Sequence, residues 1–296
     1  MIIFDAQKKY SRIPALDFEL LLSAAIKKPK EFLFTHPEYK LSFLETLRLK
    51  YFVFLYKRGY SVAAITSHKE FYGLDFFVNK NVLIPRPETE LMVESALEEI
   101  KKINKEITLV DVGTGSGCIP IAIACHAEFI SASQEIPRQV RNDMRIYATD
   151  ISREALKVAK KNAKKHNVKI KFLRGNLLES ILKRHSLPPA PYSMIITANL
   201  PYLTERQFQT EPSIQREPKA ALVADNGGLA LYEELFQQTK LLPAPNSILL
   251  LLEIDPSQST GISKLIKKYF SNAAFQIKND LAGRDRLVIL EIARTS

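Results

Sequence analysis

The 296-residue chain lacks the side-chain groupings that hold metal ions or carry thiol chemistry. Its five histidines are scattered, without an H-x-H or H-E-x-x-H pattern, so we expect no metal site. Cys118 and Cys125 lie seven residues apart in an apolar run, too far apart for a C-x-x-C zinc or redox pair. Because that spacing puts both on one helical face, we expect them to be small core residues.

Membrane spans and export signals are also missing. No stretch reaches the ~20 apolar residues that a membrane helix needs. Residues 1–9 lack the basic head, apolar run and cleavage site of a secretory signal, so we expect a cytoplasmic protein. With 46% apolar and 25% charged residues, the chain has an ordinary globular composition and enough length for one sizeable core plus a smaller domain.

Positive charge predominates, with a formal net charge of +10. Such an excess is compatible with a polyanionic partner such as nucleic acid. Much of it, however, lies on the outer face of one predicted amphipathic helix, which favours a solvated helix face over a nucleic-acid-binding surface. The lysines concerned are Lys157, Lys160, Lys161, Lys164 and Lys165.

Hydrophobic periodicity divides the chain. Apolar residues that recur every three or four positions predict a small helical domain over residues 1–66. Aromatic and β-branched residues then predict a hairpin in a linker over residues 67–87. The remainder, residues 88–296, begins with a helix from about Glu88 to Lys102.

Strand and helix patterns alternate after that helix, which predicts an α/β fold with a parallel, doubly wound sheet. A turn-rich link before the last strand predicts a closing antiparallel hairpin. The expected strands are Thr108–Val112, Arg145–Thr149, Ile170–Arg174, Met194–Ala198, Ser247–Ile254, Phe275–Asn279 and Arg286–Ile292.

A glycine-rich segment, DVGTGSG, lies between the first of these strands and an apolar helix. Its glycines allow a sharp turn and the close approach of a ligand to the backbone. The G-x-G-x-G spacing differs from the dinucleotide G-x-G-x-x-G and suits S-adenosylmethionine, with another nucleotide as the alternative. The candidate cofactor residues are Gly113, Thr114, Gly115, Ser116 and Gly117.

An acid at the end of the second strand typically binds the ribose hydroxyls of such cofactors, ~20 residues after the glycines. Asp150 is the candidate, but it follows Gly117 by 33 residues. A loop insertion at about residues 126–142, which contains Pro137, explains the excess. It resembles a translated, dispersed bacterial repeat element. We interpret it as a tolerated extension without a catalytic role; a regulatory role is the alternative.

Two further motifs end later strands. Asn176 offers an amide for the edge of an adenine and Leu177 an apolar side chain for its face; a helix N-cap is the alternative for Asn176. The tetrapeptide Asn199-Leu200-Pro201-Tyr202 follows an apolar run. Alkylating an amide or aromatic amine requires acceptors for its hydrogens and a ring that fixes its plane. Asn199 and Tyr202 supply these, although an ordinary turn remains the alternative.

Five motifs, in this order, resemble the HemK/PrmC family of protein-(glutamine-N5) methyltransferases, which act on peptide chain release factors. The likeness spans nearly the whole chain, including the helical N-terminal domain. The motifs are IPRPETE at residues 84–90, the glycine loop at 113–117, NLPY at 199–202, EPKAAL at 217–222 and GRDR at 283–286.

The resemblance implies a seven-stranded class I methyltransferase domain and an N-terminal domain that recognises class I release factors. The substrate glutamine would lie in a Gly-Gly-Gln loop. The glycine loop would bind the methionine and ribose side of S-adenosylmethionine, Asp150 the ribose hydroxyls, and Asn176 with Leu177 the adenine. We also expect a monomer that does not bind nucleic acid directly.

The resemblance further implies the catalytic roles of residues 199–202. The side-chain oxygen of Asn199, beside the cofactor, would accept one hydrogen of the glutamine NH2 group. The carbonyl of Leu200 would take the other, presented by the turn that Pro201 stiffens. Tyr202 would pack on the amide plane, and the methyl group would be transferred directly.

Two positions depart from the family pattern. Leu200 replaces the first proline of the usual Asn-Pro-Pro-Tyr, which should loosen the turn. Asn176 replaces the usual acid, so we expect weaker cofactor binding.

Asn-Leu-Pro-Tyr also resembles the motif of enzymes that dimethylate adenines in ribosomal RNA. An N6-adenine methyltransferase acting on ribosomal RNA or DNA is therefore one alternative, and a non-catalytic cofactor-binding module is another.

Overall fold

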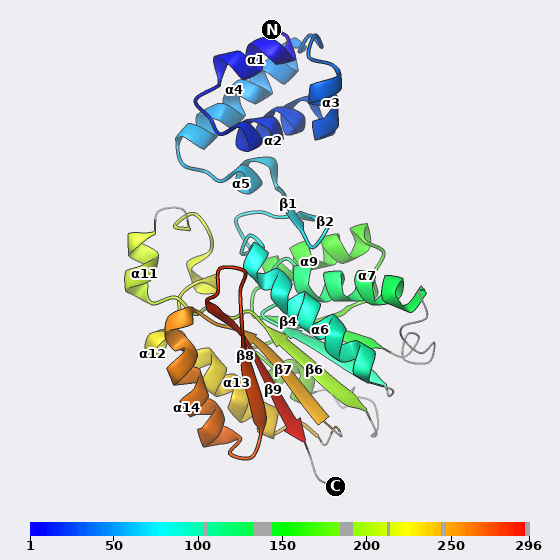
Figure 1. The fold of residues 1–296 in the computed structure, drawn as a ribbon, viewed down its shortest axis with the longest axis vertical. Helices are drawn as coiled ribbons and strands as arrows, with labels where there is room; N and C mark the ends of the chain where they lie inside the picture. The colour runs from blue at the N-terminus through cyan, green and yellow to red at the C-terminus, as the bar shows by residue number, and fades with distance from the viewer. Residues whose placement is uncertain are drawn as a thin grey trace. The chain divides into compact units, whose positions relative to one another are not determined.

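The structure, a computed structural model, describes residues 1–103, 106–132, 144–183, 192–211, 214–243, 245 and 247–293. Backbone contacts divide the chain into two units, Met1–His68 and Lys69–Ser296 (Figure 1). No helix in the described ranges is long and apolar enough to cross a membrane.

The N-terminal unit is a helical bundle around its own apolar core, as its periodicity predicted. Its longest helix begins with a capping box, in which Ser42 and Glu45 bond to each other's backbone N–H groups. Leu49 and Val53 of that helix are buried against Leu22 and its neighbours. The helices are α1 (Ile3–Lys9), α2 (Ala15–Ile26), α3 (Lys30–Thr35), α4 (Phe43–Lys57) and α5 (Val62–Thr66).

A two-stranded hairpin follows, formed by β1 (His68–Phe71) and β2 (Leu74–Phe77), which confirms the predicted hairpin. Phe71 and Phe76 are 1% and 0% exposed and belong to the apolar core of the C-terminal unit. The hairpin is therefore anchored in that unit by its aromatic side chains.

The C-terminal unit contains a seven-stranded sheet of order β5-β4-β3-β6-β7-β9-β8. The strands from β5 to β7 pair in parallel, and β9 pairs antiparallel with both β7 and β8. The predicted doubly wound sheet and its closing hairpin are confirmed. The strands are β3 (Ile107–Val112), β4 (Arg145–Asp150), β5 (Lys171–Arg174), β6 (Ser193–Ala198), β7 (Ser247–Glu253), β8 (Ala274–Asn279) and β9 (Asp285–Ala293).

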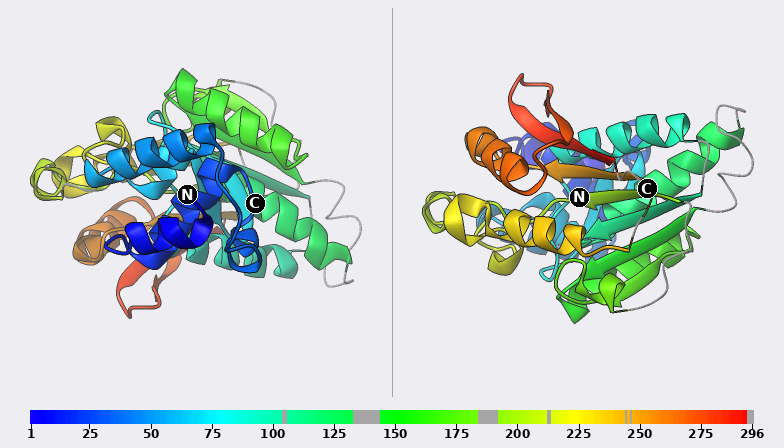
Figure 2. Two further views of the ribbon diagram at one scale, coloured as in Figure 1. Left: turned by 90° about the horizontal axis from the view of Figure 1, so that it is seen from above. Right: turned by 90° about the horizontal axis from the view of Figure 1, so that it is seen from below.

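Helices cover both faces of this sheet (Figure 2). One apolar cluster joins the sheet to α6, α7 and α9, and a second joins it to α10, α13 and α14. The helices are η1 (Pro87–Thr89), α6 (Glu90–Lys102), α7 (Cys118–Ala132), α9 (Arg153–Lys165), α10 (Glu179–Leu182), α11 (Glu205–Thr210), η2 (Lys219–Ala221), α12 (Asp225–Gly228), α13 (Ala230–Lys240), η3 (Pro256–Gln258) and α14 (Ser259–Tyr269).

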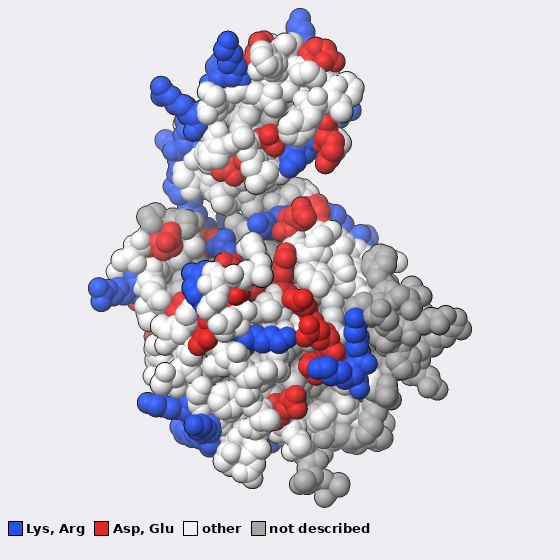
Figure 3. All heavy atoms as spheres, in the orientation of Figure 1, with Lys and Arg blue, Asp and Glu red and all other residues white. Residues whose placement is uncertain are grey.

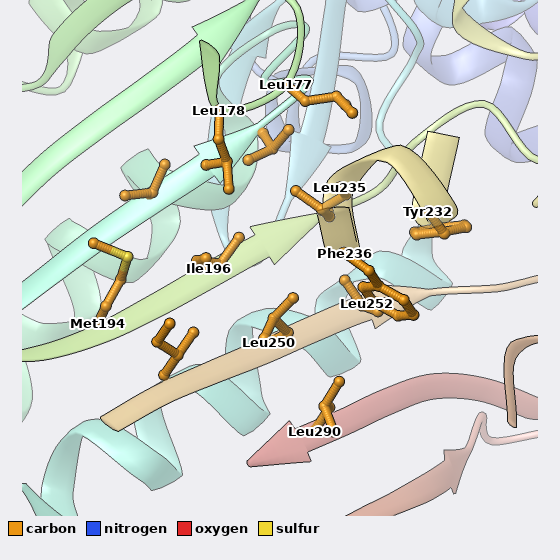
Figure 4. Close-up of a cluster of buried hydrophobic side chains, with 14 of the residues drawn as sticks. Leu177, Leu178, Met194, Ile196, Tyr232, Leu235, Phe236, Leu250, Leu252 and Leu290 are labelled. Carbon is orange, nitrogen blue, oxygen red and sulfur yellow. The ribbon is translucent and has the colours of Figure 1, made fainter. Parts of the chain in front are cut away.

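Strand β7 shows why the central strands are apolar on both sides. Leu249 and Leu251 belong to the first cluster, while Leu250 and Leu252 belong to the second. Figure 4 shows these last two leucines beside α13, which contributes Phe236. Covering both faces of a parallel sheet requires such continuous apolar runs rather than alternation.

Helix α7 corrects the predicted insertion. The pattern indicated that the helix is interrupted at His126, but it continues to Ala132. The ring of His126 lies 4.7 Å from that of Tyr72, and Ala127 is 7% exposed in the first cluster. Packing against the core therefore extends the helix into the inserted segment. Residues 133–143 lie outside the described part of the chain.

Cys118 is buried and Cys125 half-buried on helix α7, which confirms their packing role.

The basic face of α9 is exposed, as expected for a solvated helix face. Lys157 pairs with Glu154 at 2.7 Å, and Lys161 lies over the ring of Phe77. On the face shown in Figure 3, acidic side chains gather along α6, where Lys278 pairs with Glu98 at 2.9 Å. The exposed lysines of α9 therefore form a basic surface on that one helix, whereas the surface of α6 is acidic.

We predict that Leu250→Ala lowers the free energy of unfolding by about 2–5 kcal/mol, because it leaves a cavity in the second apolar cluster. Leu241→Ala is the matched control, since Leu241 is 70% exposed, and it should stay within about 0.5 kcal/mol of wild type. Urea unfolding followed by circular dichroism measures both. Equal losses in the two variants would contradict the assigned core.

Candidate active site

Strand register brings the candidate residues into one row. Val112 at the end of β3 pairs with Thr149 of β4 and Ala198 of β6, and Ala198 pairs with Leu252 of β7. The chain leaves β3 toward β4 on one side and returns to β6 on the other, which is where open α/β sheets bind ligands. The residues that follow these four positions are Gly113, Asp150, Asn199 and Glu253.

The glycine loop at the end of β3 requires its glycines. Gly113, Gly115 and Gly117 have φ of 71°, 53° and 80°, in the left-handed region that L residues avoid. A Cβ atom at Gly113 would lie 3.1 Å from Cδ2 of Leu200. Leu200 is 3% exposed, so the residue that departs from the family pattern packs its side chain into the core beneath the loop.

Asp150 connects this loop to β4. Its Oδ2 accepts from the N–H of Gly115 at 2.9 Å, and its Oδ1 accepts from the N–H of Ser152 at 2.8 Å. Burial raises the pKa of Asp150, and the two N–H donors partly counteract that rise. Each carboxylate oxygen retains a second acceptor direction, as a ribose hydroxyl requires.

Asn162 supports the loop from α9, and the motifs did not identify it. It is fully buried and accepts from the N–H of Phe77 at 2.9 Å. Its Nδ2 donates to the carbonyls of Phe77 and Ser116, both at 2.9 Å. Asn162 therefore ties β2 to the cofactor loop. The available signal was an asparagine on the apolar face of an amphipathic helix.

Asn176 follows β5 with its amide orientation set by α13. Its Nδ2 donates to Oε1 of Glu234 at 2.5 Å, and Gln238 also donates to that oxygen at 3.1 Å. The N-cap alternative is wrong, because α10 begins after Leu178 without a side-chain cap bond. Glu234 supplies a carboxylate beside the position where the family's usual acid is missing, and the oxygen of Asn176 is left to act as an acceptor.

Leu177 has φ of 48° and a side chain that is 6% exposed within the second apolar cluster. The strained backbone and the buried side chain hold the turn after β5 against the core. Its contact with the face of an adenine stays a prediction.

The amide of Asn199, like that of Asn176, is oriented by a hydrogen bond from its nitrogen to another side chain. Its Nδ2 donates to Oγ1 of Thr89 at 3.1 Å. Among the residues that the structure describes, none donates to Oδ1 of Asn199 or to the carbonyl of Leu200. Two consecutive residues thus offer acceptor oxygens, Asn199 through its side chain and Leu200 through its backbone.

Tyr202 is anchored at both ends. Its hydroxyl donates to Oε1 of Glu253 at 3.3 Å, while Nε2 of Gln258 donates to its carbonyl at 3.1 Å. A Cβ atom at Gly228 would lie 1.9 Å from that carbonyl, so only glycine fits beside it. The position of Tyr202 is therefore fixed at its hydroxyl and at its backbone.

Glu253, at the end of β7, is a buried acid that the motifs did not identify. Its side chain is 2% exposed, and no described residue donates a hydrogen bond to Oε2. Burial raises the pKa of Glu253, while the Thr89 hydroxyl and the Arg286 guanidinium lower it. Arg286, from the GRDR motif, is held by the carbonyl of Ile254 at 3.2 Å. The signal in the sequence was an acid that ends an otherwise apolar strand.

The remaining motifs support the tetrapeptide. Glu217 accepts from the N–H of Ile84 at 3.0 Å and forms an ion pair with Arg86. The N–H of Leu203 donates to the carbonyl of Leu222 at 2.8 Å. The IPRPETE and EPKAAL motifs are therefore joined to each other, and EPKAAL is joined to the segment that follows Tyr202.

The lining of the site fits S-adenosylmethionine. A Cβ atom at Gly115 would meet nothing nearer than 3.9 Å, so a ligand can approach the backbone there, and Asp150 offers acceptors to hydroxyls. Asp111 is fully buried, with Oδ1 bonded to Thr197 at 2.7 Å and Oδ2 without a donor in the described ranges. Acidic and carbonyl groups of this kind match a cofactor that carries a sulfonium, an ammonium and two ribose hydroxyls.

Fold and site define a class I methyltransferase. A family model described as "Methyltransferase domain" matches residues 103–272. A solved structure, the hMettl16 catalytic domain in complex with the MAT2A 3′UTR hairpin 1, aligns with a TM-score of 0.52 at 15% identity, over 76% of this chain and 76% of that chain. That likeness supports the fold.

Curated relatives identify the family within this class. The chain is 34% identical over 249 residues to the release factor glutamine methyltransferase of Bacillus subtilis (strain 168), covering 82% of this chain and 80% of that protein. It is 33% identical over 282 residues to that of Coxiella burnetii (strain RSA 493 / Nine Mile phase I), covering 94% and 92%. The chain belongs to the release factor glutamine methyltransferases, the family that its motifs predicted.

We predict that Asp111→Asn removes a pH-dependent loss of stability. Burial raises the pKa of Asp111 from 3.8 to about 7, so between these values the folded state holds a proton that the unfolded state has lost. The free energy of unfolding of the wild type should therefore fall relative to that of the variant as the pH rises through this window, by on the order of 4 kcal/mol. Urea unfolding of the cofactor-free proteins measures it; a difference that does not change with pH would contradict it.

Proposed function

We propose that this protein transfers a methyl group from S-adenosylmethionine to the side-chain amide nitrogen, N5, of the glutamine in the Gly-Gly-Gln motif of peptide chain release factors. Family membership supports the reaction. The observation that carries it is the pair of open acceptors at Asn199 Oδ1 and the Leu200 carbonyl, beside an anchored Tyr202. We also propose that the enzyme is cytoplasmic and monomeric and does not bind nucleic acid directly.

The two acceptors address the chemical difficulty of the substrate. A primary amide nitrogen is a poor nucleophile because its lone pair is delocalised into the carbonyl. Binding its two hydrogens to Asn199 and Leu200 raises the electron density on nitrogen and favours its pyramidal form. The ring of Tyr202 holds the amide in a reactive orientation. S-adenosylmethionine, when bound, would supply an electrophilic methyl group and leave as S-adenosylhomocysteine, and the amide nitrogen would lose one proton after the transfer.

The reaction is tested by incubating the protein with labelled S-adenosylmethionine and either purified release factor or ribosomal RNA. We expect label on the release factor, at the glutamine of Gly-Gly-Gln by mass spectrometry. A release factor with that glutamine replaced by alanine is the control and should remain unlabelled. Label on adenine, or label on neither acceptor, would contradict the proposal.

We predict that Asn199→Ala lowers glutamine methylation at least about 1000-fold, because one of the two acceptors and the amide orientation are both lost. Its affinity for S-adenosylmethionine should stay within about tenfold, since Asp150 and the glycine loop are intact. Asn272→Ala, an exposed asparagine in the same unit, is the control and should match wild type. Single-turnover kinetics and calorimetry measure the two quantities. A wild-type rate would refute the assignment.

We also propose that the helical unit recognises the release factor through one face of α4. Five large apolar side chains there are between 49% and 81% exposed. Positions three, four and eight residues apart share one side of a helix, so these residues form a continuous stripe. Exposed apolar patches of this kind mark protein-binding surfaces. The stripe consists of Phe43, Leu44, Leu47, Tyr51 and Phe54.

We predict that Phe54→Asp raises the KM for release factor about tenfold or more, because a carboxylate in an apolar interface must be desolvated. The kcat should stay within about twofold, since the catalytic residues are in the other unit. Phe34→Asp on α3, where Phe34 is 58% exposed, is the matched control and should leave KM unchanged. Steady-state kinetics with varied release factor distinguish the two; equal effects would contradict a binding role for the stripe.

A further inference from the structure

We propose that Thr89 is the positioning residue that fixes the side-chain amide of Asn199. This inference rests on the proposed function, because it explains how Asn199 presents an oxygen to the glutamine NH2 group. Thr89 was given no catalytic or cofactor-binding role by the motifs.

The amide of Asn199 has two chemically opposite ends. Rotation about its last bond exchanges the oxygen with the NH2 group, and the two orientations are similar in intrinsic energy. With the oxygen forward, the site accepts a hydrogen from the substrate. With the NH2 group forward, two donors face each other and the substrate is repelled. Catalysis therefore requires a neighbour that selects one orientation.

Thr89 makes that selection at 3.1 Å, where its Oγ1 accepts from Nδ2 of Asn199. A hydroxyl can also donate, and as a donor it would bind the oxygen of Asn199 and reverse the amide. The Thr89 hydroxyl must therefore send its own hydrogen elsewhere. Thr89 is 2% exposed, which excludes bulk water as the acceptor.

Glu253 is a neighbour of this hydroxyl, since the Thr89 hydroxyl and the Arg286 guanidinium lower the pKa of its carboxyl. Its Oε1 accepts from the Tyr202 hydroxyl at 3.3 Å. The hydrogen bond that fixes the orientation of Asn199 is the one from its Nδ2 to Thr89, which leaves Oδ1 for the substrate.

The Thr89 hydroxyl does not have the structural role that is usual at its position in the chain. Thr89 immediately precedes α6, where a threonine hydroxyl commonly caps the helix, but it makes no side-chain cap bond. Its backbone N–H is bonded instead to the carbonyl of Arg86, at 3.1 Å. Arg86 is in turn paired with Glu217, which fixes the segment before Thr89. Helix α6, which begins at Glu90, fixes the segment after it.

The test compares Thr89→Val, which removes the hydroxyl at nearly constant shape, with Thr89→Ser, which keeps it. Release factor methylation by Thr89→Val should show a kcat lowered about 10- to 100-fold, with the KM for release factor and the Kd for S-adenosylmethionine within about threefold. Thr89→Ser should restore the kcat to within about threefold of wild type.

Thr108→Val is the matched control, because Thr108 is a fully buried threonine at the opposite end of β3 whose hydroxyl has no partner among the described residues. Its kcat should equal that of wild type, and thermal unfolding should show all variants folded. An active wild type with an equally active Thr89→Val overturns this inference alone, as does a Thr89→Ser as slow as Thr89→Val. A wild type that methylates no release factor overturns the proposed function and this inference together.

Discussion

The parallel pairing of β4, β3, β6 and β7 is the constraint on which the site depends. Because the four strands are in register at their carboxyl ends, the residue after each one lies beside the residue after its neighbour. A turn after β3 makes room for a cofactor, and the adjoining positions hold an acid, an amide and a second acid. A shift of one residue in any pairing would separate them.

Two asparagines at this edge follow one physical rule. In each, the amide nitrogen is bonded to an acceptor of the protein, Glu234 for Asn176 and Thr89 for Asn199. The protein thereby leaves the amide oxygens for ligand hydrogens, which suits an adenine amino group in one case and a carboxamide in the other. Glu253 is a further buried acid at this edge, and its raised pKa shows the cost of keeping such a group away from water.

The fold and the strand-end positions of most candidate site residues could be predicted from the sequence, because they depend on local patterns. Apolar runs locate the strands, glycines locate the turn after β3, and the ends of apolar strands locate Asp150 and Asn199. Asn162, Glu234 and Glu253 could not be predicted, since each acts on a residue that is distant in the sequence and carries no motif of its own. The end of α7 was missed because packing of Ala127 against the core overrides an irregular pattern.

The central claim is that the substrate amide donates both hydrogens to Asn199 Oδ1 and the Leu200 carbonyl. A crystal structure of the protein with S-adenosylhomocysteine and a peptide that contains Gly-Gly-Gln tests it most directly. The account predicts the glutamine nitrogen within about 2.7–3.2 Å of both oxygens, with Asn199 Nδ2 still on Thr89. A glutamine whose oxygen, rather than nitrogen, faces Asn199 would contradict it.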